Sequence, residues 1–448
     1  MILRQYFRGL ALAALLSVSV AVVVSDGAHA RAGEPQTVPA RDASLAHAIE
    51  REAGGKMGKF YTSRGYRPIW IDDGLIGPDA QVFLRYLDGA GIDGLKASRY
   101  NPDELRRDIA RADSKQPQDL ARAEIALSKA FVRYVADMRR ARDVGMEFAG
   151  EGLKQPKLKD DAILRVATRR NFSRYLANMQ WMSPHYVRMR ALLRTALAKG
   201  SGEHVVDVVR LNLERARVLP SADVRHIVVD SAAARLWYYQ DGKEVGTMKV
   251  VVGAAKTQTP LLAGYVNYAI LNPYWNVPDY LTRDNVARKI LSGRTLESMH
   301  MQVLSDWGPN PRIVDPSTVN WEAVAAGRQD VRVRELPGPS NSMGKVKFLF
   351  PNDQGIYLHD TPNTDLLRKA DRHLSNGCIR LEKAFELGKW MMGKSVVAKT
   401  AEPEQAVPLP VPVPVYLTYL TATGTKKGIT LLDDVYGRDG RVSLASSR

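Results

Sequence analysis

Cysteine is almost absent from this sequence, since Cys378 is the only one in 448 residues. A lone thiol cannot form an intramolecular disulfide, which excludes a disulfide-stapled scaffold. Metal-ligand spacing is lacking as well, because there is no His-Glu-x-x-His motif and no second cysteine. His359, Asp360 and His373 do lie near Cys378 in the sequence, but nothing prescribes a tetrahedral set, and we therefore expect no metal site.

Long apolar runs are lacking beyond the N-terminus, and nothing after residue 30 has the composition of a membrane span. Within residues 1–30, two arginines precede a short apolar run, and the segment ends in small residues. This order is typical of a cleaved secretory signal, with an uncleaved anchor as the alternative. We predict a signal peptide over residues 1–30, a polar linker over residues 31–45 and an exported protein.

Acidic residues are outnumbered, with 48 Asp and Glu against 64 Lys and Arg, so the formal net charge is +16. The basic residues are spread along the chain and do not form one run, which in an exported protein argues against nucleic acid as a partner. An anionic cell-envelope polymer or a membrane surface fits this charge better. A uniformly solvated basic face explains it equally well.

The solitary Cys378 needs its own explanation, because cysteines in an exported chain usually pair. We interpret it as a candidate nucleophile. The alternative is a buried free cysteine that acts as a small hydrophobe. The residues before it, Ser375-Asn376-Gly377, favour the nucleophile, since they are typical of a turn and not of a core strand.

The apolar pattern changes period along the chain and divides it into regions. Three- and four-residue spacing predicts a helical scaffold over residues 46–220, and short alternating runs predict a β-rich domain over residues 221–400. Residues 276–344 are rich in Pro, Gly and Asn and look like an insertion, either a lid or a mobile surface loop. Over residues 401–448 we expect a Pro-rich connector and a final strand.

A thiolate nucleophile needs a base and donors that face the developing oxyanion. His359 ends a predicted strand upstream of Cys378 and is a candidate base. His373 lies in the same loop as the cysteine and competes for this role, and spacing does not decide between them. Gly377 lets the turn bend sharply, so the Gly377 and Cys378 amides are candidate oxyanion donors. A papain-like site is disfavoured, because there the cysteine precedes the histidine.

Together, His359-Asp360-Thr361-Pro362 and Ser375-Asn376-Gly377-Cys378-Ile379-Arg380 resemble the active site of the L,D-transpeptidases of bacterial cell walls, the YkuD-type catalytic domain. Further segments are similar to the large periplasmic YcbB-like subfamily: 212–215, 258–260, 272–278, 337–339, 344–348 and 434–439. The resemblance implies that Cys378 is the nucleophile and His359 the base, oriented by a backbone carbonyl at or next to Asp360. It also implies that Gly377 and Cys378 form the oxyanion turn.

Two departures from the family pattern bear on function. Many members have a second histidine directly before the glycine, where this chain has Asn376, so the role of His373 is open. Members of the large subfamily often carry a peptidoglycan-binding module ahead of the segment at 212–215, but residues 180–205 are too few to hold one.

The resemblance implies an α+β protein, in which an N-terminal helical scaffold precedes a β-rich catalytic domain with an inserted capping segment. It implies a periplasmic, monomeric enzyme without metal or organic cofactor that cross-links peptidoglycan stem peptides and is acylated by carbapenems. The implied substrate contacts are Arg380, Asn376, Ser375, His373, Tyr274 and Trp275. Two alternatives stay open, a carboxypeptidase or endopeptidase that trims stems and a non-catalytic wall-binding scaffold.

Overall fold

The computed structural model describes residues 40–169, 171–425 and 428–440. The predicted signal peptide lies outside these residues, and so does most of the predicted linker. The end of that linker, residues 40–45, is helical. No helix in the described part of the chain is long and apolar enough to cross a membrane.

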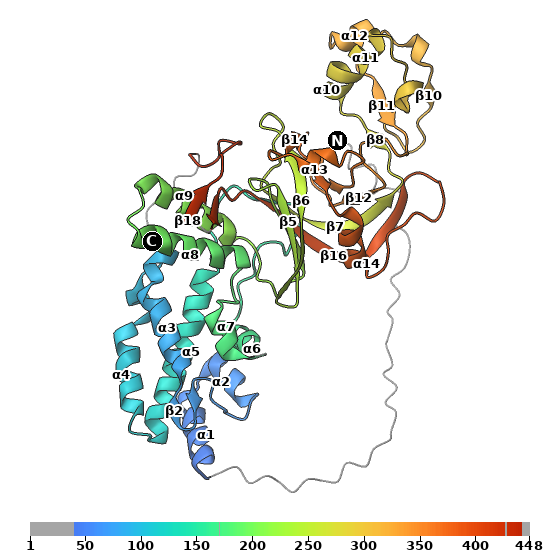
Figure 1. The fold of residues 1–448 in the computed structure, drawn as a ribbon. Helices are drawn as coiled ribbons and strands as arrows, with labels where there is room; N and C mark the ends of the chain where they lie inside the picture. The colour runs from blue at the N-terminus through green and yellow to red at the C-terminus, as the bar shows by residue number, and fades with distance from the viewer. Residues whose placement is uncertain (1–39, 170, 426–427, 441–448) are drawn as a thin grey trace, which may run out of the picture. The chain divides into compact units, whose positions relative to one another are not determined.

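The described residues form two compact units, and the first is helical. It consists of residues 40–140 and 157–181. Three of its longer helices begin with proline, whose fixed φ suits the first helical turn. The helices are α1 (Ala40–Glu52), α2 (Gly55–Thr62), α3 (Pro78–Asp88), α4 (Pro102–Ala112), α5 (Pro117–Met138), α6 (Asp160–Thr168) and α7 (Phe172–Ala177), with a small hairpin of β1 (Ile71–Asp72) and β2 (Leu75–Ile76). Figure 1 shows α3, α4 and α5 running side by side.

Aromatic rings in edge-to-face contact fill the core of the helical unit. Phe131 of α5 meets the rings of Trp70, Phe83 and Trp181 at centroid distances of 5.9, 5.6 and 5.6 Å. The buried carboxylate of Glu124 lies beside these rings. It accepts hydrogen bonds from the Tyr61 hydroxyl and from the backbone N–H groups of Ile69 and Trp70, the two residues before β1. The apolar stripes predicted from spacing are therefore core faces.

The second unit consists of residues 141–156 and 182–440. The helical region that we predicted over residues 46–220 is thus divided, because α8 (Pro184–Ala198) and α9 (Glu203–Arg217) belong with the β-rich unit. The reason is visible in α9, where Asn212 and Arg215 bond Thr421 and the Tyr419 carbonyl at the end of the last long strand. Helical periodicity identifies such helices but not the partner on which they pack.

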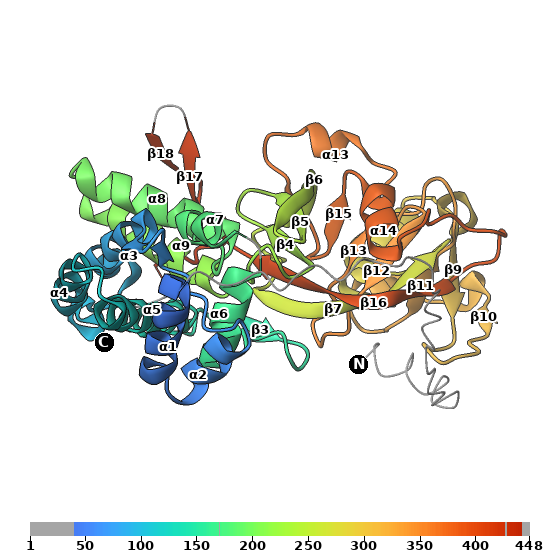
Figure 2. The same ribbon diagram turned by 90° about the horizontal axis from the view of Figure 1, so that it is seen from below.

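The strands of this unit pair into a closed ring. Its order is β12-β13-β15-β6-β5-β4-β16-β7, and β12 also pairs with β7, so the last strand meets the first. The strands are β4 (His226–Asp230), β5 (Arg235–Gln240), β6 (Lys243–Gly253), β7 (Leu262–Leu271), β12 (Val346–Leu349), β13 (Leu358–His359), β15 (Ile379–Leu381) and β16 (Gln405–Thr418), with β3 (Glu147–Phe148) beside β7 and β14 (His373–Ser375) beside β6. Figure 2 shows β4, β5 and β6 next to one another, with α14 (Ala384–Met392) over the strands.

The proline-rich segment is part of this ring and not a connector. β16 covers it and pairs with β7 on one side and with β4 on the other. Its prolines, at positions 408, 410, 412 and 414, occupy every second residue. Alternate N–H groups point to the same edge of a strand, so these prolines remove donors from one edge and leave the other able to pair. Pairing with β4 begins at Val415, directly after the last proline.

The insertion that we predicted over residues 276–344 is a folded subdomain and not an irregular loop. Its strands form a separate sheet in the order β10-β9-β11-β8. Its own apolar core includes Val286, Val303 and Trp321. We call it the capping subdomain; its elements are β8 (Trp275–Asn276), α10 (Asp279–Leu281), a π-helical turn (Thr282–Ala287), α11 (Arg288–Leu291), β9 (Met301–Leu304), β10 (Ile313–Val314), α12 (Trp321–Ala325) and β11 (Arg332–Glu335), grouped in yellow and orange in Figure 1.

Candidate active site

The turn that carries Cys378 is held by the hydroxyl of Ser375. This hydroxyl donates to the Cys378 carbonyl at 2.6 Å and accepts the Gly377 N–H at 3.2 Å. Gly377 has a φ of +108°, a backbone conformation that side chains other than glycine rarely adopt. We expected Ser375 to contact substrate, but it is buried and its oxygen is used within the turn.

Two threonines from the loop between β6 and β7 brace the same turn. The Thr257 hydroxyl donates to the Ser375 carbonyl at 2.9 Å, and the Thr259 hydroxyl donates to the Gly377 carbonyl at 2.8 Å. The loop can approach so closely because it folds back on Gly253, where an added Cβ would lie 2.1 Å from the Thr257 carbonyl oxygen. The nucleophile turn is therefore fixed at the Ser375 and Gly377 carbonyls before substrate arrives.

His359 lies on the strand next to the cysteine. β13 and β15 are parallel, with His359 opposite Arg380, and the Ile379 N–H bonds the Tyr357 carbonyl. Cys378 is therefore opposite Tyr357. Residues in register share a face, and so do residues two apart along a strand, so Cys378, His359 and Arg380 face the same side. The Tyr357 and His359 rings, 5.9 Å apart, agree with this arrangement.

The His359 ring is oriented by a main-chain carbonyl. Its Nδ1 lies 2.6 Å from the Asp360 carbonyl oxygen, and since a carbonyl can only accept, Nδ1 carries the proton. In the neutral ring Nε2 is then the nitrogen that can take a further proton. The Asp360 carboxylate has a separate task, because it accepts the Lys345 N–H at 2.9 Å.

Burial keeps this imidazole neutral. It lowers the pKa of His359 to about 3, and the positive charges of Arg380 and Lys347 act in the same direction, whereas the Asp360 and Met343 carbonyls oppose them. The side chain is 1% exposed. His359 is therefore uncharged at neutral pH, as a proton acceptor must be.

The Cys378 thiol is protonated at rest. Although the residue is partly exposed, burial raises the pKa of the thiol to about 11, against the opposing effects of Tyr357 and the Arg380 charge. The thiol lies 3.7 Å from the Gly355 carbonyl oxygen, and no bond between this thiol and His359 is found among the described residues. Transfer of its proton to His359 therefore requires the thiol to turn away from Gly355.

The oxyanion donors differ from our expectation. The Gly377 N–H is occupied by Ser375, whereas no acceptor for the Cys378 N–H is found among the residues that the structure describes. Of the two amides that we expected to form the oxyanion hole, Cys378 is thus the one that can donate to a ligand in this conformation.

His373 is held at both ring nitrogens. Nδ1 lies 2.6 Å from an Asp371 carboxylate oxygen, and Nε2 lies 2.9 Å from the Ser231 carbonyl oxygen. Its ring packs edge-on against Tyr436 at 5.5 Å. These contacts leave His373 no nitrogen to receive the thiol proton or to bind substrate, which separates it from His359 in a way that spacing could not.

The other expected substrate contacts are spread over two places. Asn376 is exposed on the turn, and Arg380 is partly buried beside the thiol, with its Nε buried and without a hydrogen-bond partner in the described structure. Tyr274 and Trp275 lie where the ring meets the capping subdomain. The Arg334 guanidinium covers the Tyr274 ring at 4.0 Å, and Trp275 packs on the capping core.

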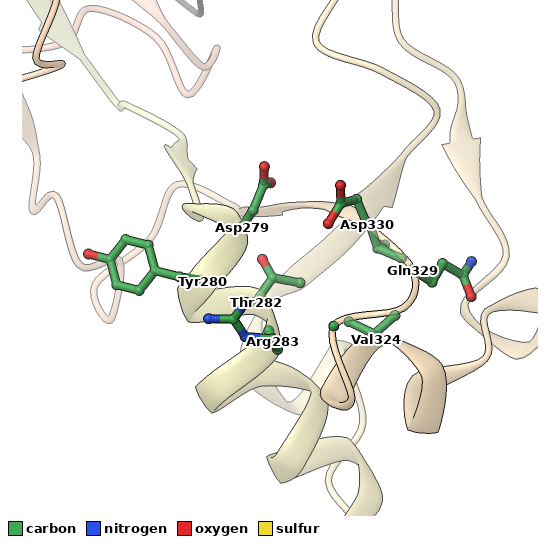
Figure 3. A pocket seen from close by; sticks show the side chains of 9 residues that line it. Asp279, Tyr280, Thr282, Arg283, Val324, Gln329 and Asp330 are labelled. Carbon is green, nitrogen blue, oxygen red and sulfur yellow. The ribbon is translucent and has the colours of Figure 1, made fainter.

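Tyr280, on α10, was not identified from the sequence. Burial raises its pKa, and the next cause is the charge of Cys378, so the two side chains are within electrostatic reach. Tyr280 also lines a pocket of the capping subdomain (Figure 3), together with Asp279, Thr282, Arg283, Val324, Gly327, Gln329, Asp330 and Val331. No periodicity or motif distinguishes Tyr280 in the sequence, and only the fold of the insertion reveals it.

Comparison with known proteins assigns both regions to families. Residues 224–413 match YkuD, the L,D-transpeptidase catalytic domain, and this range contains Cys378 and His359. Residues 55–193 match the Scaffold domain. A scaffold ahead of the catalytic domain is consistent with the YcbB-like subfamily.

Individual relatives carry related names. A Haemophilus influenzae protein named "Putative L,D-transpeptidase" is 26% identical over 400 residues, which are 87% of this chain and 79% of that protein. Two solved L,D-transpeptidases, from Mycobacterium smegmatis and Enterococcus faecium, are 16% and 14% identical, with TM-scores of 0.21 and 0.19. The matches span 43% of this chain and only 58% and 49% of those chains.

The histidine and the cysteine that face the same side of β13 and β15 thus lie within a recognised domain. The predicted fold class is confirmed, with a helical region followed by a β-rich domain. This chain carries an L,D-transpeptidase catalytic domain of the YkuD family, preceded by a Scaffold domain.

Proposed function

We propose that this protein is an exported cysteine-dependent L,D-transpeptidase that cross-links peptidoglycan stem peptides in the periplasm. The observation that carries the proposal is the parallel pairing of β13 and β15, which sets Cys378 and His359 on one face. The lone thiol, the neutral imidazole and the Asp360 carbonyl that orients it supply the groups that covalent acyl transfer requires.

In the first half of the reaction, His359 takes the thiol proton as the Cys378 sulfur attacks the carbonyl carbon of an L-residue in the donor stem. The Cys378 N–H and the nearby Arg380 charge stabilise the developing oxyanion. The C–N bond to the terminal D-alanine then breaks. Its nitrogen receives the proton from His359, D-alanine leaves, and a thioester remains on Cys378.

In the second half, an amine of a neighbouring stem, typically the side chain of a diamino acid, attacks the thioester carbonyl. His359 takes the proton of this amine, and the sulfur leaves and is reprotonated. The new amide joins the two stems. The residues present complete both halves by proton and acyl transfer alone.

Two measurements on purified protein test this proposal. Incubation with disaccharide-tetrapeptides should give cross-linked dimers and free D-alanine by mass spectrometry, and a carbapenem should add one adduct mass to the protein. Cys378→Ala should abolish dimer formation and the adduct, with an unchanged unfolding temperature. Trimmed monomers without dimers would contradict the transferase, and turnover by Cys378→Ala would contradict the covalent mechanism.

A further inference from the structure

The last described residues form a compact segment that has no part in the catalytic mechanism described above. We call residues 434–439 the C-terminal clasp. The Asp434 carboxylate accepts the backbone N–H groups of Arg438 and Asp439, both at 2.9 Å, and the hydroxyl of Tyr419 at 2.9 Å. One side chain therefore closes the clasp on itself and ties it to the residue that follows β16.

A buried arginine anchors the clasp to α9. Arg215 is 1% exposed and donates to the Asp439 carboxylate at 2.8 Å, to the Arg438 carbonyl at 2.8 Å and to the Tyr419 carbonyl at 3.1 Å. Burial of a charged group is costly unless it is paired and hydrogen-bonded. These partners meet that requirement, so the clasp has a defined position.

From this anchor, Tyr436 and Arg438 reach the loop between β6 and β7. The Tyr436 hydroxyl donates to the Gly253 carbonyl at 2.6 Å, and the Tyr436 carbonyl accepts from the Gln258 amide at 3.1 Å. Arg438 donates to the Gln258 side-chain oxygen at 2.9 Å and to the Thr259 carbonyl at 3.0 Å. The clasp thus holds the two ends of the loop that braces the nucleophile turn.

The clasp is connected to the nucleophile turn at both ends. On one side Thr259 bonds the carbonyl of Gly377, the residue directly before Cys378. On the other side the Tyr436 ring packs against His373, at the start of the strand that leads into the turn. Tyr436 is itself buried and stacked on Tyr419 at 4.9 Å, so its own position is fixed.

We propose that the C-terminal clasp positions the nucleophile turn, with Tyr436 and Arg438 as positioning residues for Cys378. The turnover assay of this proposal rests on the proposed function, because it measures dimer formation. The accessibility of the thiol can be measured without that function and depends on the geometry of the turn alone. Removal of a clasp bond should let the loop and the turn shift together. Shifts of about 1 Å remote from the reacting atoms can cost on the order of 100-fold in rate.

The first test removes one hydroxyl. Tyr436→Phe keeps the ring stack but deletes the bond that this hydroxyl donates to the Gly253 carbonyl and the bond that it accepts from the Thr259 N–H. The kcat for dimer formation should fall on the order of 10-fold or more, with KM within about twofold. The matched control is Tyr416→Phe, which deletes another buried tyrosine bond, to the Leu153 carbonyl at 2.8 Å. The control should keep wild-type kcat. Equal losses in the two variants would overturn the proposal, as would an unchanged kcat in Tyr436→Phe.

The second test removes a forked donor and keeps the charge. Arg438→Lys cannot reproduce the contacts to Gln258 and Thr259, and kcat should fall as for Tyr436→Phe. Arg225→Lys is the matched control, because Arg225 also donates to two carbonyls, those of Trp390 and Met391, and covers the Trp390 ring at 4.6 Å. If Arg225→Lys loses as much activity as Arg438→Lys, the effect is general loosening and the proposal fails.

A third readout separates failure of the clasp from failure of the proposed function. Alkylation of the single cysteine by iodoacetamide needs no peptidoglycan substrate. A loosened turn exposes the sulfur to water, so the pH midpoint of alkylation should move downward in Tyr436→Phe and Arg438→Lys but not in the two controls. If the wild-type protein is alkylated but never forms dimers, the proposed function is wrong. The alkylation midpoints alone then test the proposal that the clasp positions the nucleophile turn. Identical midpoints in all five proteins would overturn the clasp proposal.

Discussion

Cys378 and His359 are both uncharged at rest, because burial shifts their pKa values in opposite directions. It disfavours the thiolate of Cys378 and the imidazolium of His359 alike. The site therefore does not store a thiolate-imidazolium pair, and charge separates only when a carbonyl carbon is present to receive the sulfur. Such a resting thiol should react slowly with reagents that require a preformed thiolate.

The pH dependence of alkylation follows from this resting state. Below pH 11 the thiolate fraction of Cys378 should rise about tenfold per pH unit, so the iodoacetamide rate should rise steadily from pH 7 towards about pH 11. No inflection is expected near pH 6.5, because the pKa of His359 is already lowered to about 3. Labelling of wild type and Cys378→Ala by mass spectrometry checks this. A plateau that begins near pH 7 would show a stored ion pair instead.

The two histidines should differ strongly when each is replaced. His359→Ala removes the proton acceptor and should lower kcat by about two to four orders of magnitude. His373→Ala removes bonds to Asp371 and Ser231 and a ring contact with Tyr436, so it should lower the unfolding temperature and reduce kcat by no more than about tenfold. Steady-state rates and thermal unfolding of both variants decide. Similar losses of kcat would mean that the base is assigned wrongly.

At the residue scale, the sequence singled out candidate catalytic residues but not the groups that hold them in place. Cys378 was singled out because a lone cysteine beside turn residues is unusual in an exported chain, whereas His359 was preferred to His373 only through the family resemblance. Thr257 and Thr259 were not singled out, since hydroxyls that bond a distant turn leave no periodic signal. Ser375 was expected to contact substrate, because the sequence cannot show that its hydroxyl is hydrogen-bonded within the turn.

At the element scale, strand pairing is what brings the site together. Before the nucleophile turn, Ser375 of β14 pairs with Gly253 of β6. After the turn, Arg380 of β15 pairs with Val251 of β6. One long strand, β6, therefore pairs with the chain on both sides of the nucleophile turn. The sequence correctly predicted a β-rich region after residue 220 and a strand that ends at His359. It predicted the final strand that forms the end of β16 but took the proline-rich first part of β16 for a connector, because prolines usually argue against a central strand. The spacing of these prolines by two was not recognised as compatible with pairing along one edge.

The fit between β6 and the loop that follows it makes a sharp prediction for Gly253. Gly253→Ala places a methyl group against three backbone atoms within 2.8 Å, so the loop must move. We expect a loss of about 1–3 kcal/mol in unfolding free energy and loss of most dimer formation, because Thr259 would leave Gly377. Gly91→Ala is the control, since its added Cβ meets nothing within 4 Å. Wild-type activity in Gly253→Ala would show that the loop does not brace the turn.

At the scale of the whole molecule, the sequence predicted the order of regions well and their boundaries poorly. The change of period near residue 220 correctly marks the start of the β-rich region, whereas α8 and α9 belong with that region through contacts far along the chain. The capping subdomain was taken for an irregular segment because its helices and strands are short. Its separate core could be recognised only once these elements were seen to pack together.

The separate core of the capping subdomain allows it to be removed. Asn276 of β8 lies opposite Arg334 of β11, so a two-residue Asn-Gly turn in place of residues 277–333 would close these strands as a hairpin. The variant loses Tyr280, which lies within electrostatic reach of Cys378. If the subdomain clamps the donor stem, dimer formation should fall at least about 100-fold, because a peptide needs positioning.

Alkylation of Cys378 by iodoacetamide at pH 9 serves as the reference rate for this deletion, since a small reagent needs only the sulfur. That rate should stay within about threefold of wild type, or rise, as the thiol becomes more accessible. A parallel fall of both rates would mean that the subdomain supports the fold of the nucleophile turn. Unchanged dimer formation would mean that substrate is held by the ring strands alone, with Arg380 and Asn376 as the residues to test next.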